Sequence, residues 1–263
     1  MARIRFEDVR KEFDTGDARI CAIDEVSLEI PSGTFASLVG PSGCGKTTLL
    51  NIVAGFEAPT AGRASVDGRE VRAPGPDRGV VFQEPGLFPW LRVEGNVAFP
   101  LRVRGLPAGD IQARVSQILD QVGLGPFRRS YPAELSGGMR QRVAIGRVLA
   151  MDPAVLLMDE PFAALDVQTR NLMQEFLLRL LERQRKSVLF ITHDIQEAVF
   201  LADRVYIMSA RPGRVKEALE VPLPRPRTVE SMFLPAFHEI VDRAYKVVRE
   251  EAIKAMQMSE AIA

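Results

Sequence analysis

The sequence is poor in cysteine, carries no excess charge of either sign and lacks a long apolar run. Of its 263 residues only Cys21 and Cys44 are cysteines, too few for a disulfide framework. A bridge at Cys44 would also obstruct the glycine-rich segment in which that residue lies. We therefore expect the protein to work in a reducing cytosol.

The charges balance, with 34 Lys and Arg against 34 Asp and Glu. A protein without net positive charge has no field with which to hold DNA or RNA by counterion release, so nucleic acid is disfavoured as the main partner. The N-terminus carries charges where a signal peptide needs an apolar core, and no apolar stretch reaches the length that spans a bilayer. We expect a soluble protein, or one that something else holds at a membrane.

What the sequence does contain is a phosphate-binding loop directly after the apolar stretch Phe35–Val39. The loop consists of Gly40, Pro41, Ser42, Gly43, Cys44, Gly45, Lys46, Thr47 and Thr48. Its glycines let N–H groups curl around an anion, its lysine supplies a point charge, and the Thr47 hydroxyl is placed to ligate Mg²⁺. The alternative is an ordinary strand-to-helix turn. The apolar stripe from Leu49 to Val53, which stops at Gly55, supplies the helix that a phosphate loop needs.

Two kinds of strand pattern surround this loop. Apolar residues at every second position between residues 3 and 30 predict antiparallel strands, and Asp67-Gly68 predicts a hairpin turn between Val66 and Val71. Continuous apolar runs predict a parallel sheet covered on both faces. These runs are Val80–Phe82, Val155–Met158, Val188–Ile191 and Val205–Met208. The predicted fold class is therefore α/β, with an N-terminal antiparallel β subdomain.

Helical spacing appears in two further regions. Apolar residues recur at every third or fourth position from Ile111 to Val122 and stop at Gly123. This spacing predicts a helical insertion over about residues 86–150. Prolines after Arg214 predict a linker. The predicted organisation is one domain over 1–227 and a C-terminal helical extension over 228–263. That extension has three open roles, which are packing on the domain, bracing a dimer and regulation.

An acidic pair, Asp159 and Glu160, follows the predicted strand that ends at Met158. Ligands of open α/β sheets bind at the carboxyl ends of the strands. At such a place Asp159 would hold Mg²⁺ through water, and Glu160 would take the proton from an attacking water. The alternative is an acidic loop that only caps the next helix.

A second anion site is suggested by Ser136-Gly137-Gly138 before an amphipathic run. Ser136 can cap a helix whose apolar residues include Val143, Ile145 and Leu149. The free N–H groups at the start of such a helix would bind an anion. Read alone, however, the segment is also an ordinary start of a helix.

Taken in order, these segments resemble the ATP-binding subunit of an ABC transporter. The resemblance rests on Gly40–Thr48, Gln83, Leu135–Gly138, Met158–Glu160, Ala164–Asp166 and Thr192–Asp194. It runs from about residue 3 to 215, and the Ser-Gly-Gly element separates this family from other P-loop ATPases. The resemblance implies a P-loop NTPase (RecA-like) core that binds ATP and Mg²⁺ and hydrolyses the ATP.

The resemblance also implies a role for each matched residue. Gln83 would touch Mg²⁺, together with Thr47 and Asp159, and would report the γ-phosphate to the helical insertion. His193 would hold the γ-phosphate and complete the catalytic set with Glu160 and Gln83. Alternatively, such a Gln is a solvated strand end, and such a His is a structural residue.

Three further expectations concern the nucleotide. Phe13 lies where the family has an aromatic ring that stacks on adenine, although Phe13 could instead end a strand against the core. Asp166 would bridge to the site of a second subunit. Cys44 lies among N–H donors at a helix start, which predicts some thiolate character and alkylation that ATP slows.

The family further implies a head-to-tail dimer with two buried ATP molecules. The residues of this chain that would act at the ATP site of the opposite subunit are Leu135, Ser136, Gly137, Gly138 and Gln141. These would complete the ATP site of a second copy, and the dimer would close on ATP and reopen after hydrolysis.

Partner chains are expected at an apolar segment after Gln83. Leu87, Phe88 and Trp90, the single tryptophan, would form a docking site if they are exposed together. In the family this region receives a short cytoplasmic helix of the integral membrane permease. The alternative is that the three residues pack beneath the helical insertion.

Several stretches are closest to the ATPases of nitrate, sulfonate, taurine and bicarbonate importers. They are Gly79–Gln83 with Leu87–Trp90, Ser209–Val215 and Pro224–Arg227. We expect ATP hydrolysis to drive import of a small anion, and the first stretch favours taurine or a related aliphatic sulfonate. The implied partners are permease subunits and, through them, a periplasmic or surface solute-binding protein. The implied location is the cytoplasmic face of the bacterial inner membrane.

Two other function classes fit the sequence less well. A soluble ABC-type ATPase acting on DNA or ribosomes usually has two cassettes or a long insert, and the gap between Gln83 and Ser136 is too short for such an arm. A non-catalytic nucleotide sensor would lack Glu160 or His193, and both are present.

Overall fold

The computed structural model describes residues 2–14, 16, 19–182, 184 and 186–260. The chain divides into two compact units. Unit 1 comprises Met1–Gly75 with Arg185–Ala263, and unit 2 comprises Pro76–Gln184. These bounds differ from the domain 1–227 and the extension 228–263, which stay a prediction.

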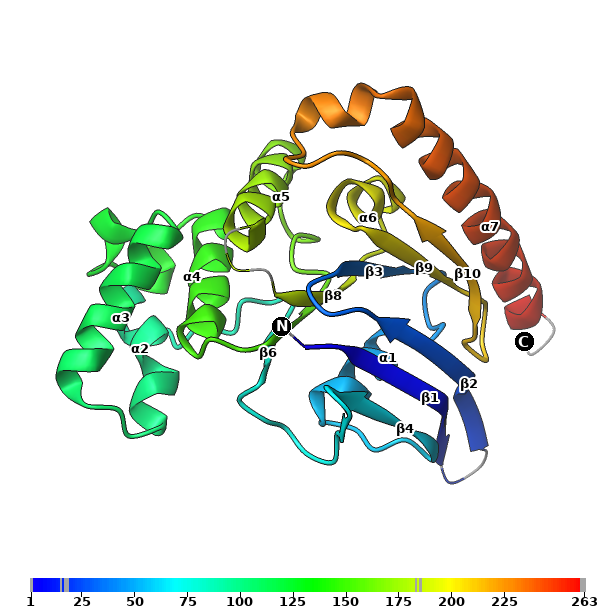
Figure 1. The fold of residues 1–263 in the computed structure, drawn as a ribbon, viewed down its shortest axis with the longest axis horizontal. Helices are drawn as coiled ribbons and strands as arrows, with labels where there is room; N and C mark the ends of the chain where they lie inside the picture. The colour runs from blue at the N-terminus through cyan, green and yellow to red at the C-terminus, as the bar shows by residue number, and fades with distance from the viewer. Residues whose placement is uncertain (1, 15, 17–18, 183, 185, 261–263) are drawn as a thin grey trace. The chain divides into compact units, whose positions relative to one another are not determined.

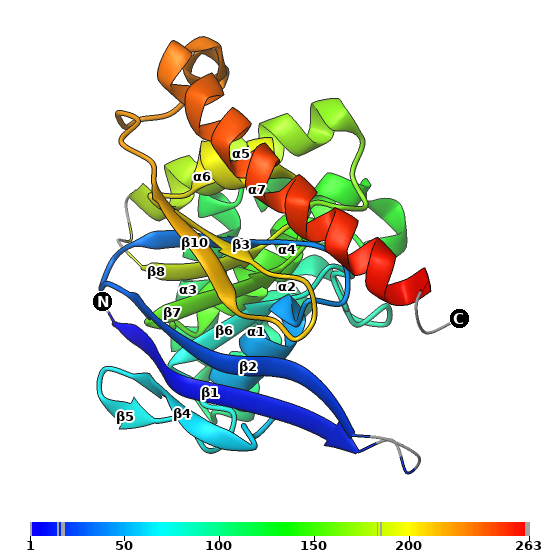
Figure 2. The same cartoon turned by 90° about the vertical axis from the view of Figure 1, so that its right-hand side faces the viewer.

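Unit 1 contains the expected antiparallel sheet. Its strands are β1 (Ile4–Asp14), β2 (Arg19–Ile30), β4 (Ala61–Val66) and β5 (Arg69–Glu70), in the order β2-β1-β4-β5 (Figure 2). The turn between β4 and β5 is formed by Asp67 and Gly68, with φ of 49° and 75°. Two positive φ values in succession are typical of the type I′ turn that the Asp-Gly pair predicted.

Unit 1 also contains the strand that leads into the phosphate loop. This strand, β3 (Phe35–Val39), runs parallel to β8 (Ser187–Ile191) on one side and β9 (Arg204–Met208) on the other. All five residues of β3 are buried, as the continuous apolar run predicted. The edge strand β10 (Val215–Glu220) pairs antiparallel with β9 and was not predicted. Helices α1 (Lys46–Ala54) and α6 (Ile195–Leu201) follow β3 and β8 along the chain.

The proline-rich segment after β10 is anchored to the body of unit 1. The buried Arg227 donates hydrogen bonds from Nη1 to the carbonyl oxygens of Phe200 and Ala202, at 3.0 and 2.7 Å. Burial lowers the pKa of Arg227 to about 10. The expected linker is therefore irregular in backbone but tightly held.

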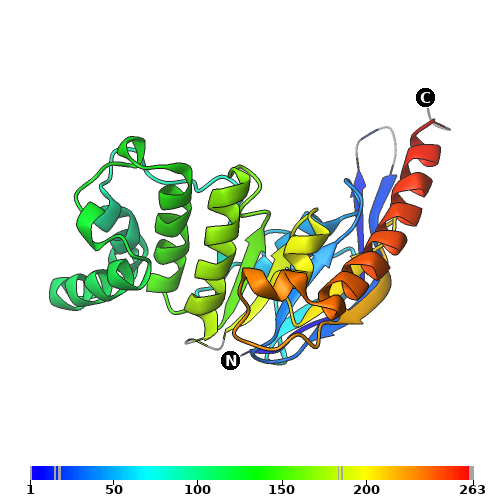
Figure 3. The ribbon, with the colours of Figure 1, turned by 90° about the horizontal axis from the view of Figure 1, so that it is seen from above.

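The C-terminal extension forms a short 3₁₀ segment (Val229–Phe233) and the long helix α7 (Pro235–Glu260). Helix α7 packs on α6, β9 and β10 (Figure 3), with Phe237 and Ala244 buried in the contact. The apolar spacing predicted this helix, and of its three open roles the structure shows that it packs on unit 1, while bracing a dimer and regulation stay untested.

Unit 2 contains two parallel strands and the expected helical insertion between them. The strands are β6 (Arg78–Val81) and β7 (Val155–Asp159), and the helices are α2 (Val93–Val103), α3 (Ala108–Gln121), α4 (Gly137–Ala150) and α5 (Val167–Glu182). Helices α2, α3 and α4 form the insertion and contact one another (Figure 1). Two 3₁₀ turns, Gly125–Phe127 and Pro132–Glu134, connect α3 to α4. Phe82, which the apolar run included in the strand, lies just beyond it and is exposed.

In the part of the chain that the structure describes, no helix combines the length and the apolar character needed to cross a membrane.

Candidate functional site

The phosphate loop connects β3 to α1 in unit 1. Gly43 and Gly45 adopt φ of 74° and 94°, which a side chain would make unfavourable. No side chain caps α1, so the helix start presents backbone N–H groups in the way that suits an anion. The buried Lys46 donates hydrogen bonds from Nζ to the carbonyls of Gly40 and Pro41, at 2.9 and 3.0 Å. The loop therefore holds the lysine ammonium within itself.

The loop packs closely against neighbouring backbone in unit 1. A Cβ on Gly45 would lie 2.3 Å from Cδ1 of Ile23 in β2, and one on Gly40 would lie 3.0 Å from Cβ of Met208 at the end of β9. A Cβ on Gly45 would also lie 3.1 Å from the carbonyl oxygen of Ala22, and one on Gly40 would lie 3.0 Å from that of Met208, so a side chain at either position would force neighbouring backbone to shift. Glycine is thus required here by space as well as by backbone conformation.

The pKa of the Cys44 thiol is raised and not lowered as its sequence context predicted. Only 1% of its surface is exposed, and burial raises the pKa of its thiol, although the Lys46 ammonium offsets part of that shift. Lys46 Nζ lies 3.8 Å from its sulfur. The expectation of thiolate character was therefore wrong, because desolvation outweighs the N–H donors of the loop.

His193 also belongs to unit 1 and follows β8. The side chain of His193 is exposed, while the preceding Thr192 is buried. The hydroxyl of Thr192 accepts a hydrogen bond from the N–H of Asp194 at 3.0 Å, and Asp194 caps α6. Because β3 and β8 are parallel neighbours, His193 and the phosphate loop lie at the same carboxyl edge of this sheet.

Phe13 lies near the end of β1 in the antiparallel sheet. It is 37% exposed, whereas Phe6 in the same strand is 2% exposed. Lys11 Nζ lies 5.0 Å from the centre of the Phe13 ring. The ring is therefore not a core residue like Phe6, and its role in stacking on adenine stays a prediction.

In unit 2, the acidic pair lies at the carboxyl end of β7. Asp159 is the last residue of the strand, and both carboxylates are half-buried. Glu160 adopts φ of 45°, in the left-handed region that is costly for a residue with a side chain. Such strain at a polar residue is a common property of functional sites.

Asp166 immediately precedes helix α5. Its Oδ1 accepts a hydrogen bond from the N–H of Thr169 at 2.9 Å. This N–H and the Thr169 hydroxyl lower the pKa of Asp166. The carboxylate is exposed and is held in the ionised form by the helix start.

Ser136 caps α4, as predicted. Its Oγ accepts a hydrogen bond from the N–H of Met139 at 3.3 Å, and the side chain of Ser136 is exposed. Leu135 is buried and anchors the segment. A Cβ on Gly138 would lie 2.8 Å from Cγ2 of Thr169, so the start of α4 packs directly on α5. The three residues thus present a rigid helix start at the surface of unit 2.

Gln141 has a contact that the sequence pattern did not reveal. Its side chain is buried, and Nε2 donates to the carbonyl of Phe82 at 3.4 Å. Gln83, the next residue, is exposed. The Gln141 amide therefore ties α4 to the segment that carries Gln83, whereas its role in the site of a second copy stays a prediction.

The predicted docking residues are only partly packed. Trp90 is 71% exposed, and its ring centre lies 5.6 Å from that of Phe88. Phe88 is half-buried against Phe99 of α2, at 4.4 Å between ring centres, and Leu87 is also half-buried. The packing alternative therefore fits Leu87 and Phe88 in part but does not fit Trp90.

The buried side chain of Asn96 helps to hold this aromatic segment in place, together with Arg147, which donates to the carbonyls of Gly86 and Pro85 at 2.8 and 3.0 Å. Asn96, which is fully buried in α2, accepts a hydrogen bond at Oδ1 from the N–H of Phe88 at 2.8 Å. Its Nδ2 donates to the carbonyls of Phe88 and Leu91, at 3.2 and 3.0 Å. The loop before α2 is thus fixed by side-chain hydrogen bonds rather than by regular structure.

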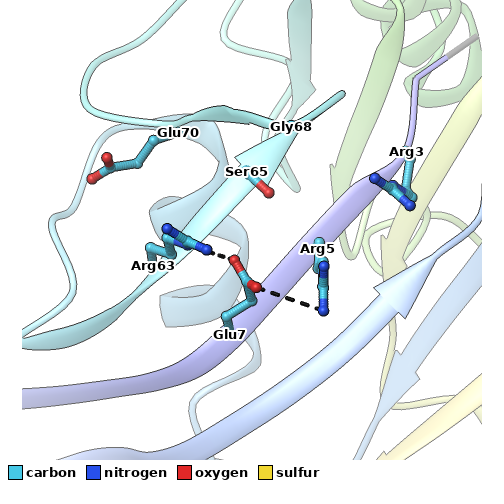
Figure 4. A pocket seen from close by; sticks show the side chains of 7 residues that line it. All are labelled: Arg3, Arg5, Glu7, Arg63, Ser65, Gly68 and Glu70. Atoms are coloured by element: carbon cyan, nitrogen blue, oxygen red, sulfur yellow. Dashed lines mark hydrogen bonds and ion pairs between the residues drawn. The ribbon is translucent and has the colours of Figure 1, made fainter.

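A separate hollow of about 170 Å³ lies on the antiparallel sheet of unit 1 (Figure 4). Its lining is Arg3, Arg5, Glu7, Arg63, Ser65, Gly68 and Glu70. Glu7 pairs with Arg63 and Arg5, at 2.5 and 3.6 Å, and Arg3 pairs with Glu29 at 3.6 Å. Three guanidiniums and two carboxylates line the hollow, and each guanidinium is paired with a carboxylate, so we assign the hollow no function.

Comparison with known proteins places these features in one family. The profile of the ABC transporter family matches residues 23–163. The nitrate import ATP-binding protein NrtD of Synechocystis sp. is 44% identical over 247 residues, which cover 94% of this chain and 89% of that protein. The taurine import ATP-binding protein TauB of Jannaschia sp. is 46% identical over 223 residues, which cover 84% and 83%. A solved dimer of an ATP-binding cassette, bound to ADP and Pi after hydrolysis, has a TM-score of 0.72 and 32% identity and covers 83% of this chain and 98% of its own.

Proposed function

Since this chain belongs to the ATP-binding subunits of ABC importers, which are ATPases, we propose that its hydrolysis of ATP drives the import of a small anion. The observation that carries the proposal is the phosphate loop, which contains the buried Lys46 and leads into the uncapped start of α1. The relatives named for nitrate and taurine import support the anionic cargo. The competing proposal, an ATPase that acts on DNA or ribosomes, has no comparable support.

Oxygen donors suited to Mg²⁺ are present in both units. They are the Thr47 hydroxyl, the Gln83 amide and the Asp159 carboxylate. Among the described residues, no group of three or more His, Cys, Asp or Glu side chains could hold a metal ion. This donor set fits Mg²⁺, which is usually held by one or two protein oxygens together with water and substrate phosphates. When bound, the ion would neutralise charge on the phosphates.

The chain's own residues would divide the chemistry of hydrolysis among them. Lys46 and the N–H groups of the loop would bind the outer phosphates, and exposed His193 would contact the γ-phosphate. Glu160 would accept a proton from the attacking water as its oxygen bonds to phosphorus and the bond to ADP breaks. Phosphate and ADP would then leave, and the carboxyl of Glu160 would return its proton to solvent.

A second copy of the chain would complete each site. The rigid helix start at Ser136 presents N–H groups at the surface of unit 2, where a γ-phosphate bound by another copy could meet them. The related cassette was solved as a dimer, which supports this arrangement. Asp166 would lie at the same junction between copies.

The remaining parts of the transporter are also proposed. Permease subunits would receive the exposed Trp90 surface and hold the chain at the cytoplasmic face of the bacterial inner membrane, and a solute-binding protein outside would deliver the cargo. No residue of this chain is proposed to touch the cargo. Taurine or a related sulfonate, nitrate and bicarbonate are the candidate anions.

Substitution of Glu160 by Gln tests the catalytic assignment. We expect Glu160→Gln to bind MgATP normally, to lose at least about 100-fold in ATP turnover, and to accumulate as a dimer during size-exclusion chromatography with ATP. Glu182→Gln, a change at an exposed position near the end of α5, is the matched control and should behave as the unmodified chain. Normal turnover in Glu160→Gln would contradict the role of this carboxylate.

Reconstitution tests the cargo. The chain would be combined with permease subunits and a solute-binding protein in lipid vesicles, and ATP turnover would be measured with taurine, nitrate or bicarbonate outside. Stimulation by one anion identifies the cargo class. Stimulation by none of them, with a functional permease present, would count against an anion importer.

A further inference from the structure

We propose that Glu251, near the end of α7, is a positioning residue for the phosphate loop and acts through the turn formed by residues 209–214. Every contact in this proposal lies within unit 1. Of the two measurements that test this role, alkylation of Cys44 is independent of the proposed ATP site, and only the dissociation constant of MgATP rests on the proposed function. It assigns to the C-terminal helix a role in the nucleotide site that its sequence position does not suggest.

The first step is the contact between α7 and the turn. Glu251 is 2% exposed, although most of the neighbouring α7 side chains are at the surface. Its Oε2 accepts a hydrogen bond from the backbone N–H of Ala210 at 3.0 Å. Ala210 is itself buried and is the second residue after β9. A buried N–H that lost this acceptor would be left without compensation, which makes the contact costly to break.

The second step is the charge on Glu251. Lys254 donates from Nζ to Oε1 at 2.6 Å, and Lys216 of β10 lies 3.7 Å from the same oxygen. Burial alone would raise the pKa of Glu251, but the Lys254 and Ala210 hydrogen bonds outweigh it and lower the pKa. The carboxylate is therefore ionised at neutral pH and holds the Ala210 N–H through a charge-assisted bond.

The third step is the stiffness of the turn. The N–H of Ser209 donates to the carbonyl of Arg214 at 2.9 Å, and the N–H of Arg214 donates to Oγ of Ser209 at 3.0 Å. Oγ of Ser209 also lies 2.9 Å from the carbonyl oxygen of Ala210 and 3.1 Å from that of Pro212, both of which lie within the turn and can accept its one proton. A turn closed by these bonds moves as one body, so a constraint at Ala210 is passed on to Gly213.

The fourth step is the contact between the turn and the phosphate loop. The N–H of Gly213 donates to the carbonyl of Ala22 at 2.9 Å, and its carbonyl accepts from the N–H of Asp24 at 3.0 Å. The side chain of Arg214 pairs with Asp24. On the other side, a Cβ on Gly213 would lie 2.0 Å from the carbonyl oxygen of Cys44. The turn is thus wedged between β2 and the centre of the phosphate loop.

These contacts connect α7 to Cys44, the residue in the middle of the phosphate loop. A glycine-rich loop has more conformations available than other backbone, so its N–H groups point at one place only if neighbours confine it. If the turn loosens, the loop loses its support behind Cys44. The fraction of molecules ready to bind phosphate then falls, and the apparent dissociation constant rises by the same factor.

Cys44 offers a direct measurement of this support. In a Cys21→Ser background it is the single thiol of the chain, and it is buried in the folded loop. The rate of alkylation by iodoacetamide, measured without nucleotide, reports the fraction of molecules in which the loop has opened. The dissociation constant of MgATP, measured by calorimetry on the same proteins, reports the consequence for the site.

We expect Glu251→Ala to speed alkylation of Cys44 about tenfold or more, because the buried Ala210 N–H loses its acceptor. The dissociation constant of MgATP should rise about threefold. Glu251→Gln keeps an oxygen that accepts from Ala210 and should stay within about twofold of the unmodified chain in both measurements. Glu250→Ala, at the exposed neighbouring position, should change neither.

Two results would overturn the proposal. One is a Glu251→Ala protein that melts at a lower temperature but is alkylated no faster than Glu250→Ala, which would leave Glu251 with a role in docking α7 alone. If Glu251→Ala does not fold, Glu251→Asp is measured in its place. The side chain of Asp is one methylene shorter than that of Glu, so its carboxylate is drawn back from the N–H of Ala210. Equal alkylation of Glu251→Asp and Glu251→Gln is the second contrary result. Failure of ATP binding in the unmodified chain would contradict the proposed function and leave the alkylation comparison intact.

Discussion

The carbonyl oxygen of Cys44 lies directly against the backbone of Gly213, so that a Cβ at Gly213 would be only 2.0 Å away. Gly213 cannot retreat, because its N–H and carbonyl are both paired with β2, at Ala22 and Asp24. We therefore expect Gly213→Ala to push the phosphate loop out of place. The affinity for MgATP should fall by about tenfold or more, since an overlap with backbone cannot be relieved by a rotamer change.

Gly109→Ala is the matched control for that change. A Cβ at Gly109 would meet nothing within 4 Å, and the residue lies in helix α3, where alanine is favoured over glycine. This variant should keep its ATP affinity and melt at the same or a slightly higher temperature. Equal ATP affinity in both variants, measured by calorimetry, would show that the loop tolerates movement at Gly213.

Trp90→Ala should separate partner binding from folding. Because Trp90 is 71% exposed, its loss should leave the melting temperature and ATP binding unchanged. Recovery with permease subunits on affinity resin should fall at least about tenfold if Trp90 is a central contact. Leu172→Ala on α5, another exposed apolar position, should leave recovery unchanged. A Trp90→Ala chain that fails to fold would favour the packing alternative.

Arg227→Met should destabilise unit 1. The change keeps an unbranched side chain but removes the donor for the buried carbonyls of Phe200 and Ala202. We expect the free energy of unfolding in urea to fall by about 3 kcal/mol. Arg249→Met, at an exposed position on α7, should cost less than about 0.5 kcal/mol. Similar losses in the two variants would show that the Arg227 bonds contribute little.

Stability should fall in acid partly through Glu251. Its pKa is lowered from the usual 4.5, because hydrogen bonds to Lys254 and Ala210 outweigh burial, so the folded state favours the ionised form. This contribution is complete above the unfolded pKa and is lost as the pH falls through the folded pKa. The free energy of unfolding, measured by urea titration, should therefore drop more steeply below about pH 5 in the unmodified chain than in Glu251→Gln. Parallel curves would contradict the lowered pKa.

Most of the fold could be predicted from local patterns. The antiparallel strands, the Asp67-Gly68 turn, the buried runs and the cap at Ser136 each depend on residues that are close in sequence. Strand β10 was missed because half of its residues, Lys216, Glu217 and Glu220, are charged, and its pairing with β9 is what makes it a strand. Edge strands often carry such charges, so an alternating pattern is weak there.

The parts of the site that could not be predicted depend on distant residues. Cys44 was expected to ionise because its neighbours in sequence donate N–H groups, but burial of the thiol raises its pKa. The bond from Gln141 to the segment before Gln83 and the bond from Ala210 to Glu251 likewise join separate elements. Nothing in the spacing of these residues indicates such contacts.

The side chain of Asn96 makes four hydrogen bonds to backbone groups of the loop that carries Trp90, and these bonds affect the entropy cost of binding a partner. We expect a partner that binds this surface to spend little conformational entropy on ordering the backbone of the loop, because the side chain of Asn96 already holds it. Replacing Asn96 would leave every contact atom of Trp90 in the chain, yet the complex would form from a broader set of loop conformations.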